Sequence, residues 1–294
     1  MALRSVHLLL TYRCDRECDH CFVWSGPSAE GVMGLGMVRE VLAGALRMGT
    51  VRRIYFEGGE PFLYYPLLLE GMRLVAQAGL ENGIVTNAYW ATGPEEARLW
   101  LLPLREWNLV DLTVSRDPFH GEEAEPLLAR QVAGELGIPV GEISIGRPGE
   151  ERPAREGDLR FRGRAAEKLT PGLPLLPWET LRECPHEDLA DPERVHLDPL
   201  GNVHLCQGLV LGNVREHPLD ALFASYCPRE HPIVGPLLEG GPAALVEEYG
   251  LPHEEGYVEE CHLCYRARQS LRASFPACLG PDQMYGEGPM VCSP

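Results

Sequence analysis

The chain has 294 residues, of which 45% are hydrophobic and 23% charged, a composition that indicates a globular protein with a substantial core, in one large domain or a large domain with a smaller one. Its formal net charge of −17 disfavours a nucleic-acid partner, because neutralising phosphates needs clustered Lys and Arg. Lys168 is the only lysine, which excludes most Schiff-base chemistry.

The sequence shows neither a targeting segment nor a membrane span. Residues 1–12 contain a short apolar run without a signal-peptide cleavage site, and no later apolar run approaches 18 residues. We therefore expect a cytoplasmic protein that does not contact a membrane. In that reducing compartment, the ten cysteines indicate metal ligands rather than disulfides.

Strand-like and helix-like runs alternate in the first half of the chain. Strands are predicted at 6–11, 52–57, 83–87, 110–115 and 140–145, and helices around 38–46 and at 65–79, 94–107 and 122–137. Repeated β/α units imply a parallel sheet with right-handed crossovers. A partial barrel and a doubly wound sheet both fit this periodicity, and in either one ligands gather at the C-terminal ends of the strands.

From about residue 150 the alternation gives way to segments rich in Pro, Gly and Arg. We place a domain boundary near residues 165 to 180, and divide the chain into residues 1–170 and 171–294. In the second part, residues 194–206 predict a β-hairpin with a turn at Pro199–Asn202, followed by a short loop and a helix.

Three cysteines with CxxxCxxC spacing follow the first predicted strand: Cys14, Cys18 and Cys21. A structural zinc site and a fully ligated [4Fe–4S] cluster both need four protein ligands, so this set is one ligand short. The second predicted strand runs into the motif GGEP. There Gly58 and Gly59 allow the backbone to approach a ligand closely, and Glu60 adds a carboxylate.

The combination of CxxxCxxC with GGEP on the following strand resembles the radical S-adenosylmethionine (SAM) superfamily. The resemblance implies a partial (β/α)6 barrel of the TIM type. It also implies that the three cysteines hold three irons of a [4Fe–4S] cluster, while the amino and carboxylate groups of SAM chelate the fourth iron. Electron transfer from the cluster would then cleave SAM and release a 5′-deoxyadenosyl radical.

The same resemblance assigns residues to SAM binding. Gly58, Gly59 and Glu60 match the segment that binds the methionine amino group, and Phe22 occupies the position that contacts adenine. Further candidates lie at the ends of the third and fourth predicted strands: Asn87, Ser115 and Asp117. Structural explanations also exist for these residues, namely core packing for the aromatic ring and caps or turns for the polar side chains.

One element of the family pattern is missing. Relatives with an added C-terminal cluster carry an arginine soon after the Asp and His of the fourth strand, where it pairs with the methionine carboxylate. Here the first arginine after His120 is Arg130, on a predicted helix, and Arg116 is closer to the strand end. The partner of the methionine carboxylate is therefore unassigned.

Four later cysteines form a second candidate metal site: Cys184, Cys206, Cys261 and Cys264. Four thiolates suit a zinc ion or a [4Fe–4S] cluster equally well. The order Cys, GxxxxC (Gly201–Cys206), CxxC resembles the auxiliary-cluster region of SPASM and twitch radical enzymes. The shorter twitch version fits better, because the SPASM pattern does not continue after Cys264. It implies a small α+β domain with one auxiliary [4Fe–4S] cluster. The sequence GRA at Gly163–Ala165 is also common in such proteins, at the last barrel strand.

Three cysteines remain outside both sets: Cys227, Cys278 and Cys292. We expect each to be a small buried hydrophobe or a terminal thiol. Cys278 and Cys292 flank a tail rich in Gly and Pro that could fold over the pocket, which makes them candidates for a proton or hydrogen donor. No other catalytic residue is assigned.

The resemblance implies an enzyme that abstracts hydrogen from an unactivated carbon, with a low-potential reductant such as flavodoxin or ferredoxin. An auxiliary cluster favours net oxidation or bond formation over isomerisation or epimerisation. The substrate would be a small molecule or a ribosomal peptide. Because only 13 residues precede Cys14, we expect a peptide to be delivered by a separate leader-binding protein. The alternative is a non-catalytic iron–sulfur or zinc protein, an electron carrier or scaffold, which leaves GGEP without a purpose.

Overall fold

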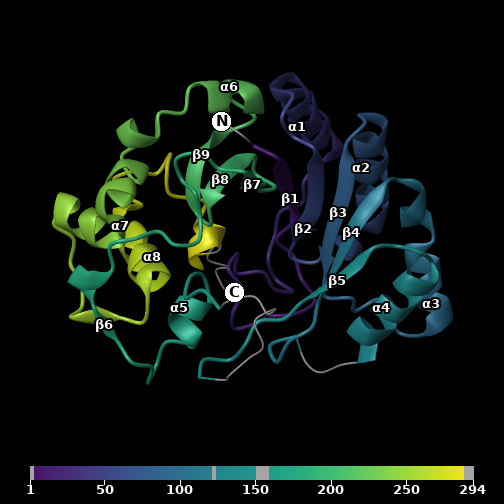
Figure 1. The fold of residues 1–294 in the computed structure, drawn as a ribbon, viewed down its shortest axis with the longest axis horizontal. Helices are drawn as coiled ribbons and strands as arrows, with labels where there is room; N and C mark the ends of the chain where they lie inside the picture. The colour runs from purple at the N-terminus through teal and green to yellow at the C-terminus, as the bar shows by residue number, and fades with distance from the viewer. Residues whose placement is uncertain (1–2, 121–123, 150–158, 288–294) are drawn as a thin grey trace, which may run out of the picture.

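The computed structural model describes residues 3–120, 124–149 and 159–287. An eight-stranded sheet with the order β5-β4-β3-β2-β1-β7-β8-β9 runs through the molecule (Figure 1). Its first five strands in the chain pair in parallel with their neighbours. They are β1 (Ser5–Thr11), β2 (Arg53–Gly58), β3 (Glu81–Thr86), β4 (Leu109–Ser115) and β5 (Val140–Ile143). These strands confirm the predicted α/β fold class with a parallel sheet.

Four helices follow one another along the outer side of β1 to β5 (Figure 1). They are α1 (Leu35–Met48), α2 (Tyr65–Gln77), α3 (Pro94–Leu101) and α4 (Ala124–Glu135). The third helix is shorter than predicted because Pro103 starts a separate 3₁₀ turn, Pro103–Glu106. No helix within the described ranges is long and apolar enough to cross a bilayer.

Alternating side chains of β1 separate two groups of buried residues. Val6, Leu8 and Leu10 belong to the main hydrophobic core, which includes the apolar face of α1. Leu9 points the other way and packs in a smaller cluster with Tyr12, as expected for a strand with a side-chain period of two. The face of β1 that carries Leu9 therefore packs against different residues from the face that packs against the helices.

The C-terminal half extends the same sheet. β7 (Arg194–Leu197) runs parallel to β1, and β8 (Asn202–Cys206) and β9 (Leu209–Asn213) follow in antiparallel pairs. The predicted hairpin turn after β7 is confirmed, whereas β9 was not predicted. Other elements are α6 (Leu219–Ala224), α7 (Val234–Tyr249), α8 (Glu260–Leu271), and a small sheet of β6 (Leu176–Pro177) and β10 (Gly256–Tyr257). The division of the chain at residue 170 stays a prediction.

The segment with the sequence GRA is a turn rather than a strand, and it leads into the short helix α5 (Ala165–Lys168). Gly163 has a φ of 60°, in the region that favours glycine. A Cβ atom there would lie 2.7 Å from the carbonyl oxygen of Cys21 and 2.7 Å from the Cα of Phe22. This turn therefore packs directly against the backbone of the first cysteine set.

Candidate functional site

The first cysteine set lies in the loop after β1. Cys14 and Cys18 are buried and Cys21 is partly buried. Burial raises the pKa of the Cys14 and Cys18 thiols, and the nearby Cys21 adds to the rise in both, so the three sulfurs share one site. The backbone N–H of Arg16 donates to Cys14 Sγ at 3.4 Å, and that of Ser25 to Cys21 Sγ at 3.3 Å. Such N–H···S contacts suit thiolates that hold a metal centre.

A buried arginine from a distant segment anchors this loop. The guanidinium of Arg164 donates to the carbonyl oxygens of Cys18, at 2.6 Å, and Ser25, at 2.7 Å. Its backbone N–H donates to the carbonyl of Cys21 at 3.0 Å, and its side chain lies over the ring of Trp24. Sequence analysis noted Arg164 only as part of GRA, because nothing local to it indicates partners so far away in the chain.

The two glycines of GGEP bring the end of β2 against the chain that enters the cysteine loop. Gly58 has a φ of 125°, which L side chains rarely adopt. At Gly59 a Cβ atom would lie 1.9 Å from the carbonyl oxygen of Arg13. The N–H groups of Gly59 and Glu60 donate to the carbonyls of Thr11 and Arg13, at 2.7 and 2.9 Å. Glycine is therefore required here by the backbone contact itself.

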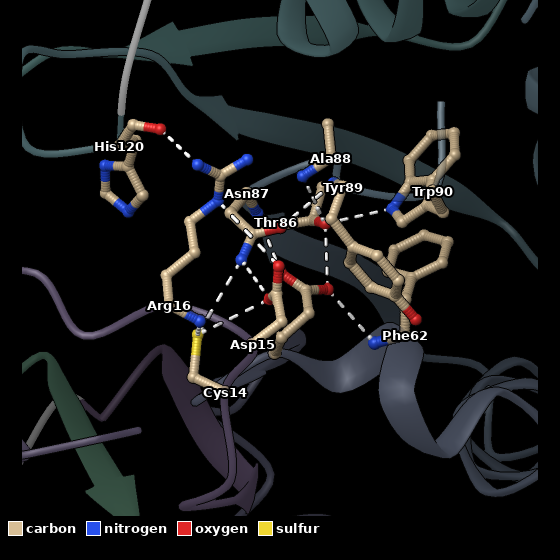
Figure 2. Close-up of polar contacts among 11 residues, drawn as sticks. Cys14, Asp15, Arg16, Phe62, Thr86, Asn87, Ala88, Tyr89, Trp90 and His120 are labelled. Atoms are coloured by element: carbon tan, nitrogen blue, oxygen red, sulfur yellow. Dashed lines mark hydrogen bonds and ion pairs between the residues drawn. The ribbon is translucent and has the colours of Figure 1, made fainter. Parts of the chain in front are cut away.

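The Glu60 carboxylate is fully buried and connects the ends of β2 and β3. It accepts hydrogen bonds from the N–H of Phe62 at 3.1 Å, the hydroxyl of Thr86 at 2.9 Å and the N–H of Asn87 at 2.8 Å (Figure 2). Burial raises the pKa of Glu60 to about 7, despite these hydrogen bonds, and Asp15 adds to the rise. The site thus holds a carboxyl group whose charge depends on its neighbours.

Asp15 and Arg16, inside the CxxxCxxC motif, also reach this site (Figure 2). The side-chain amide of Asn87 donates to Asp15 Oδ1 at 2.7 Å and lies 3.7 Å from Cys14 Sγ. The guanidinium of Arg16 donates to the carbonyl of His120, and its Nε lies 3.9 Å from Asp15 Oδ2. Sequence analysis did not single out either residue, although their position between two metal-ligating cysteines was a usable signal.

The two arginines considered from the sequence lie elsewhere. Arg130 is on α4, as predicted, and pairs with Glu142. Arg116 also pairs with Glu142, at 3.6 Å, so one glutamate on β5 engages both.

Ser115 and Asp117 close β4 and are buried. Asp117 accepts hydrogen bonds from the N–H groups of Phe119 and His120, both at 3.0 Å, and from Nδ1 of His120 at 2.9 Å. Burial acts to raise the pKa of Asp117, but the hydrogen bonds and charge of His120 outweigh it and lower the pKa. The carboxylate therefore organises its own turn, and its role in ribose binding stays a prediction.

The second cysteine set is also brought together. Cys184 precedes β7, Cys206 ends β8, and Cys261 and Cys264 lie in the first turns of α8. Burial raises the pKa of the Cys184, Cys261 and Cys264 thiols, and the nearby Cys206 adds to the rise in each. Four thiols from three separate segments therefore form one site.

Two buried arginines flank these four thiols. Arg162 Nη1 donates to Cys206 Sγ at 3.0 Å. Arg268 is 1% exposed and donates from Nε to the carbonyl of Cys264 at 3.4 Å. Although burial acts to lower its pKa, the pKa of Arg268 is raised, first by Cys264 and then by other acidic neighbours that include Cys206. A buried cation is costly without a counter-charge, and an anionic metal–thiolate centre would provide one.

The remaining candidates are placed as follows. Phe22 is partly buried, with the Arg162 guanidinium 5.4 Å from its ring centroid. Cys227 is exposed and Cys278 is partly buried, so only the latter fits the expected packing role. The donor role of Cys278 stays a prediction, and Cys292 lies outside the described residues.

Comparison with known proteins agrees with this geometry. Residues 8–113 match the family model of the Radical SAM superfamily. A similar curated protein is the putative peptide biosynthesis protein YydG of Bacillus subtilis (strain 168), 28% identical over 117 residues. That match covers 40% of this chain and only 37% of YydG, so the chain spans well under half of that relative.

Two solved structures share the fold. Streptococcus suis SuiB bound to precursor peptide SuiA superposes with a TM-score of 0.55 at 11% identity, over 89% of this chain and 76% of SuiB. BtrN in complex with AdoMet and 2-DOIA gives 0.54 at 18% identity, over 76% of this chain and 82% of BtrN. These similarities confirm the partial-barrel fold class. Residues 8–113 of this chain thus form a radical SAM domain.

Proposed function

We propose that this radical SAM enzyme performs net oxidation or bond formation on a peptide or a small molecule, with an auxiliary cluster beside the substrate. The observation that carries the proposal is that Arg162 contacts both cysteine regions. Its guanidinium lies over Phe22, directly after Cys21, and donates to Cys206 of the second set. Both metal centres would therefore face one shared space, in which a substrate radical could form and lose an electron.

The thiol donors and their spacing fit a [4Fe–4S] cluster at Cys14, Cys18 and Cys21, which would supply the electron for cleaving SAM. Arg164 fixes the loop that carries these thiols, and the N–H groups of Arg16 and Ser25 stabilise their charge. The side chains around Glu60 would then bind the methionine part of SAM.

The polar groups beside Cys14 match the amino and carboxylate groups of that methionine part. The carboxylates of Glu60 and Asp15 would accept hydrogen bonds from the N–H groups of its amino group, since both lie next to the thiol that starts the motif. The guanidinium of Arg16 also lies beside Asp15, with its Nε 3.9 Å from Asp15 Oδ2 (Figure 2). We assign Arg16 as the partner of the methionine carboxylate, the position that sequence analysis left open.

Replacing Glu60 by Gln should weaken SAM binding and change its pH dependence. Because the pKa of Glu60 is about 7, the group is mainly neutral at pH 6 and mainly ionised at pH 8. The ionised form is the stronger acceptor for the N–H groups of the amino group, so the affinity of the unmodified protein should rise by up to about tenfold over that range. Glu60→Gln should remove the rise while iron content stays unchanged. A retained pH profile would mean that another group binds the amino group of SAM.

Replacing Arg16 by Gln should lower SAM affinity by about 10- to 100-fold, because a charge-assisted hydrogen bond contributes roughly 1.5 to 3 kcal/mol. Equilibrium binding to reconstituted protein measures this loss. Arg130→Gln is the matched control, since that arginine pairs with Glu142 instead. Equal affinities for the two variants would place the carboxylate partner elsewhere.

The substrate class rests on what the similar proteins are described as handling. YydG is described as a putative peptide biosynthesis protein, SuiB was solved with a precursor peptide, and BtrN with 2-DOIA. A peptide is thus one proposal and a small molecule the other, with a flavodoxin or ferredoxin as the proposed reductant. Deuterium transfer from a labelled candidate into 5′-deoxyadenosine would identify the substrate.

The ratio of product to 5′-deoxyadenosine tests the reaction type. Net oxidation consumes one SAM for each turnover, so the two compounds should form in equal amounts. Product in large excess would mean that SAM is regenerated and would point to an isomerase or epimerase. Absence of SAM cleavage by reduced, fully reconstituted protein would support the electron carrier or scaffold instead.

A further inference from the structure

Three ionisable side chains converge on the sheet at a place that neither cysteine set uses. His7 is on β1, Glu57 on β2 and His196 on β7, and the register pairs His7 directly with His196. Glu57 Oε1 lies 3.0 Å from Nε2 of His196 and 3.4 Å from Nδ1 of His7. All three atoms lie within 4.8 Å of one another, which is the spacing of ligands around a single metal ion.

Hydrogen bonding accounts for this convergence only in part. Glu57 Oε1 lies within hydrogen-bond distance of both imidazoles, yet Nδ1 of His7 and Oε1 of Glu57 are buried without a partner of good hydrogen-bond geometry. A buried polar atom without a partner is costly, and a cation between these two atoms would satisfy both.

The surroundings of His7 fix its orientation. Its second ring nitrogen, Nε2, lies 3.3 Å from the hydroxyl of Ser5, and its ring stacks on Tyr55 with centroids 4.4 Å apart. Metal-ligating histidines commonly engage their other nitrogen in this way, because the contact sets the tautomer and aims the free lone pair.

A route for an ion exists as well. His7 and Tyr55 line a cavity of about 780 Å³, whose wall also includes Arg4 and Arg194 at the starts of β1 and β7. On the other side, the ring centroid of His196 lies 5.7 Å from that of Phe22, next to the first cysteine set. The three side chains therefore lie between an open cavity and the proposed SAM site.

We propose that His7, Glu57 and His196 bind a divalent transition-metal ion, for which Zn²⁺ is the best match to two imidazoles and one carboxylate. Three protein ligands leave a coordination position for water or for a substrate oxygen. The use of this metal ion as a Lewis acid that holds a substrate rests on the proposed function, whereas binding of the ion does not.

The test counts zinc and iron separately in the same samples. Anaerobically reconstituted protein, stripped with a chelating resin, is titrated with ZnCl₂, washed and analysed by mass spectrometry of its metals. We expect about one zinc per chain, lost in Glu57→Gln and in His196→Ala while iron stays constant. His253→Ala is the control, because that histidine is exposed and lies against Trp178, and it should keep the zinc.

A further variant, Ser5→Ala, removes only the contact to Nε2 of His7 and should weaken zinc affinity by about 10- to 100-fold.

Zinc retained by both ligand variants, or absent from unmodified protein with a full iron complement, would overturn the proposal. Zinc gained only as iron is lost would mean that it enters the cysteine sites, which also overturns it. If His196→Ala fails to fold, the nearly isosteric Glu57→Gln decides alone. Missing iron, by contrast, would count against the proposed clusters and not against this site.

Discussion

Protein reconstituted without oxygen is expected to hold about eight irons with matching sulfide, because each of two thiol sets would carry four. Replacing one set by alanine should leave about four: Cys14→Ala, Cys18→Ala and Cys21→Ala. Reductive cleavage of SAM should be abolished at the same time, since the remaining cluster has no open iron. Iron and sulfide assays, together with the electron paramagnetic resonance of the reduced protein, measure both effects.

The control is Cys227→Ala, because that thiol is exposed and belongs to neither set. It should keep all eight irons. Four irons with one zinc in the unmodified protein would instead place zinc at Cys184, Cys206, Cys261 and Cys264, and would remove the auxiliary cluster from the proposal.

Gly59→Ala should destabilise the protein more than any other glycine-to-alanine substitution at the site. Its Cβ would lie 1.9 Å from the carbonyl oxygen of Arg13, so β2 and the cysteine loop must move apart and lose the hydrogen bonds between them. We expect unfolding free energy to fall by about 3 kcal/mol. The iron held by the first cysteine set should be lost and that of the second set retained.

Gly36→Ala is the matched control for this prediction. It is also a glycine to alanine change, but it lies in α1 with no atom within 4 Å of the added methyl group. Its effect should be neutral, or stabilising by about 0.5 to 1 kcal/mol. Denaturation midpoints that are equal for the two variants would show that the loop tolerates displacement.

Local sequence patterns were sufficient for the strands and helices that carry strong periodicity. Residues 65–79 and 83–87 were predicted as helix and strand and are observed as α2 and β3, with ends that differ by at most two residues. β9 was missed because Leu209–Asn213 is short, although Gln207–Gly208 before it, with Gly208 at a φ of 71°, was a usable hairpin signal. α7 could not be predicted, since Gly240, Gly241 and Pro242 interrupt it with a kink.

The candidate site was likewise predictable from the sequence only in part. CxxxCxxC and GGEP are continuous in sequence, so the family resemblance that these motifs carry pointed to the chemistry. Arg164 and Arg268 act on residues far away in the chain, and a single arginine in a sequence carries no sign of its partners. The same holds for His7 and His196, which only strand pairing brings together.

The pairing of β7 with β1 has a practical consequence for dissecting the molecule. A fragment ending near residue 170 would make β1 an exposed edge strand, whose unpaired backbone N–H and C=O groups would promote aggregation. It would also uncover the side of α1 that now meets α6. Separating the roles of the two cysteine regions therefore calls for point substitutions in the intact polypeptide rather than for truncation.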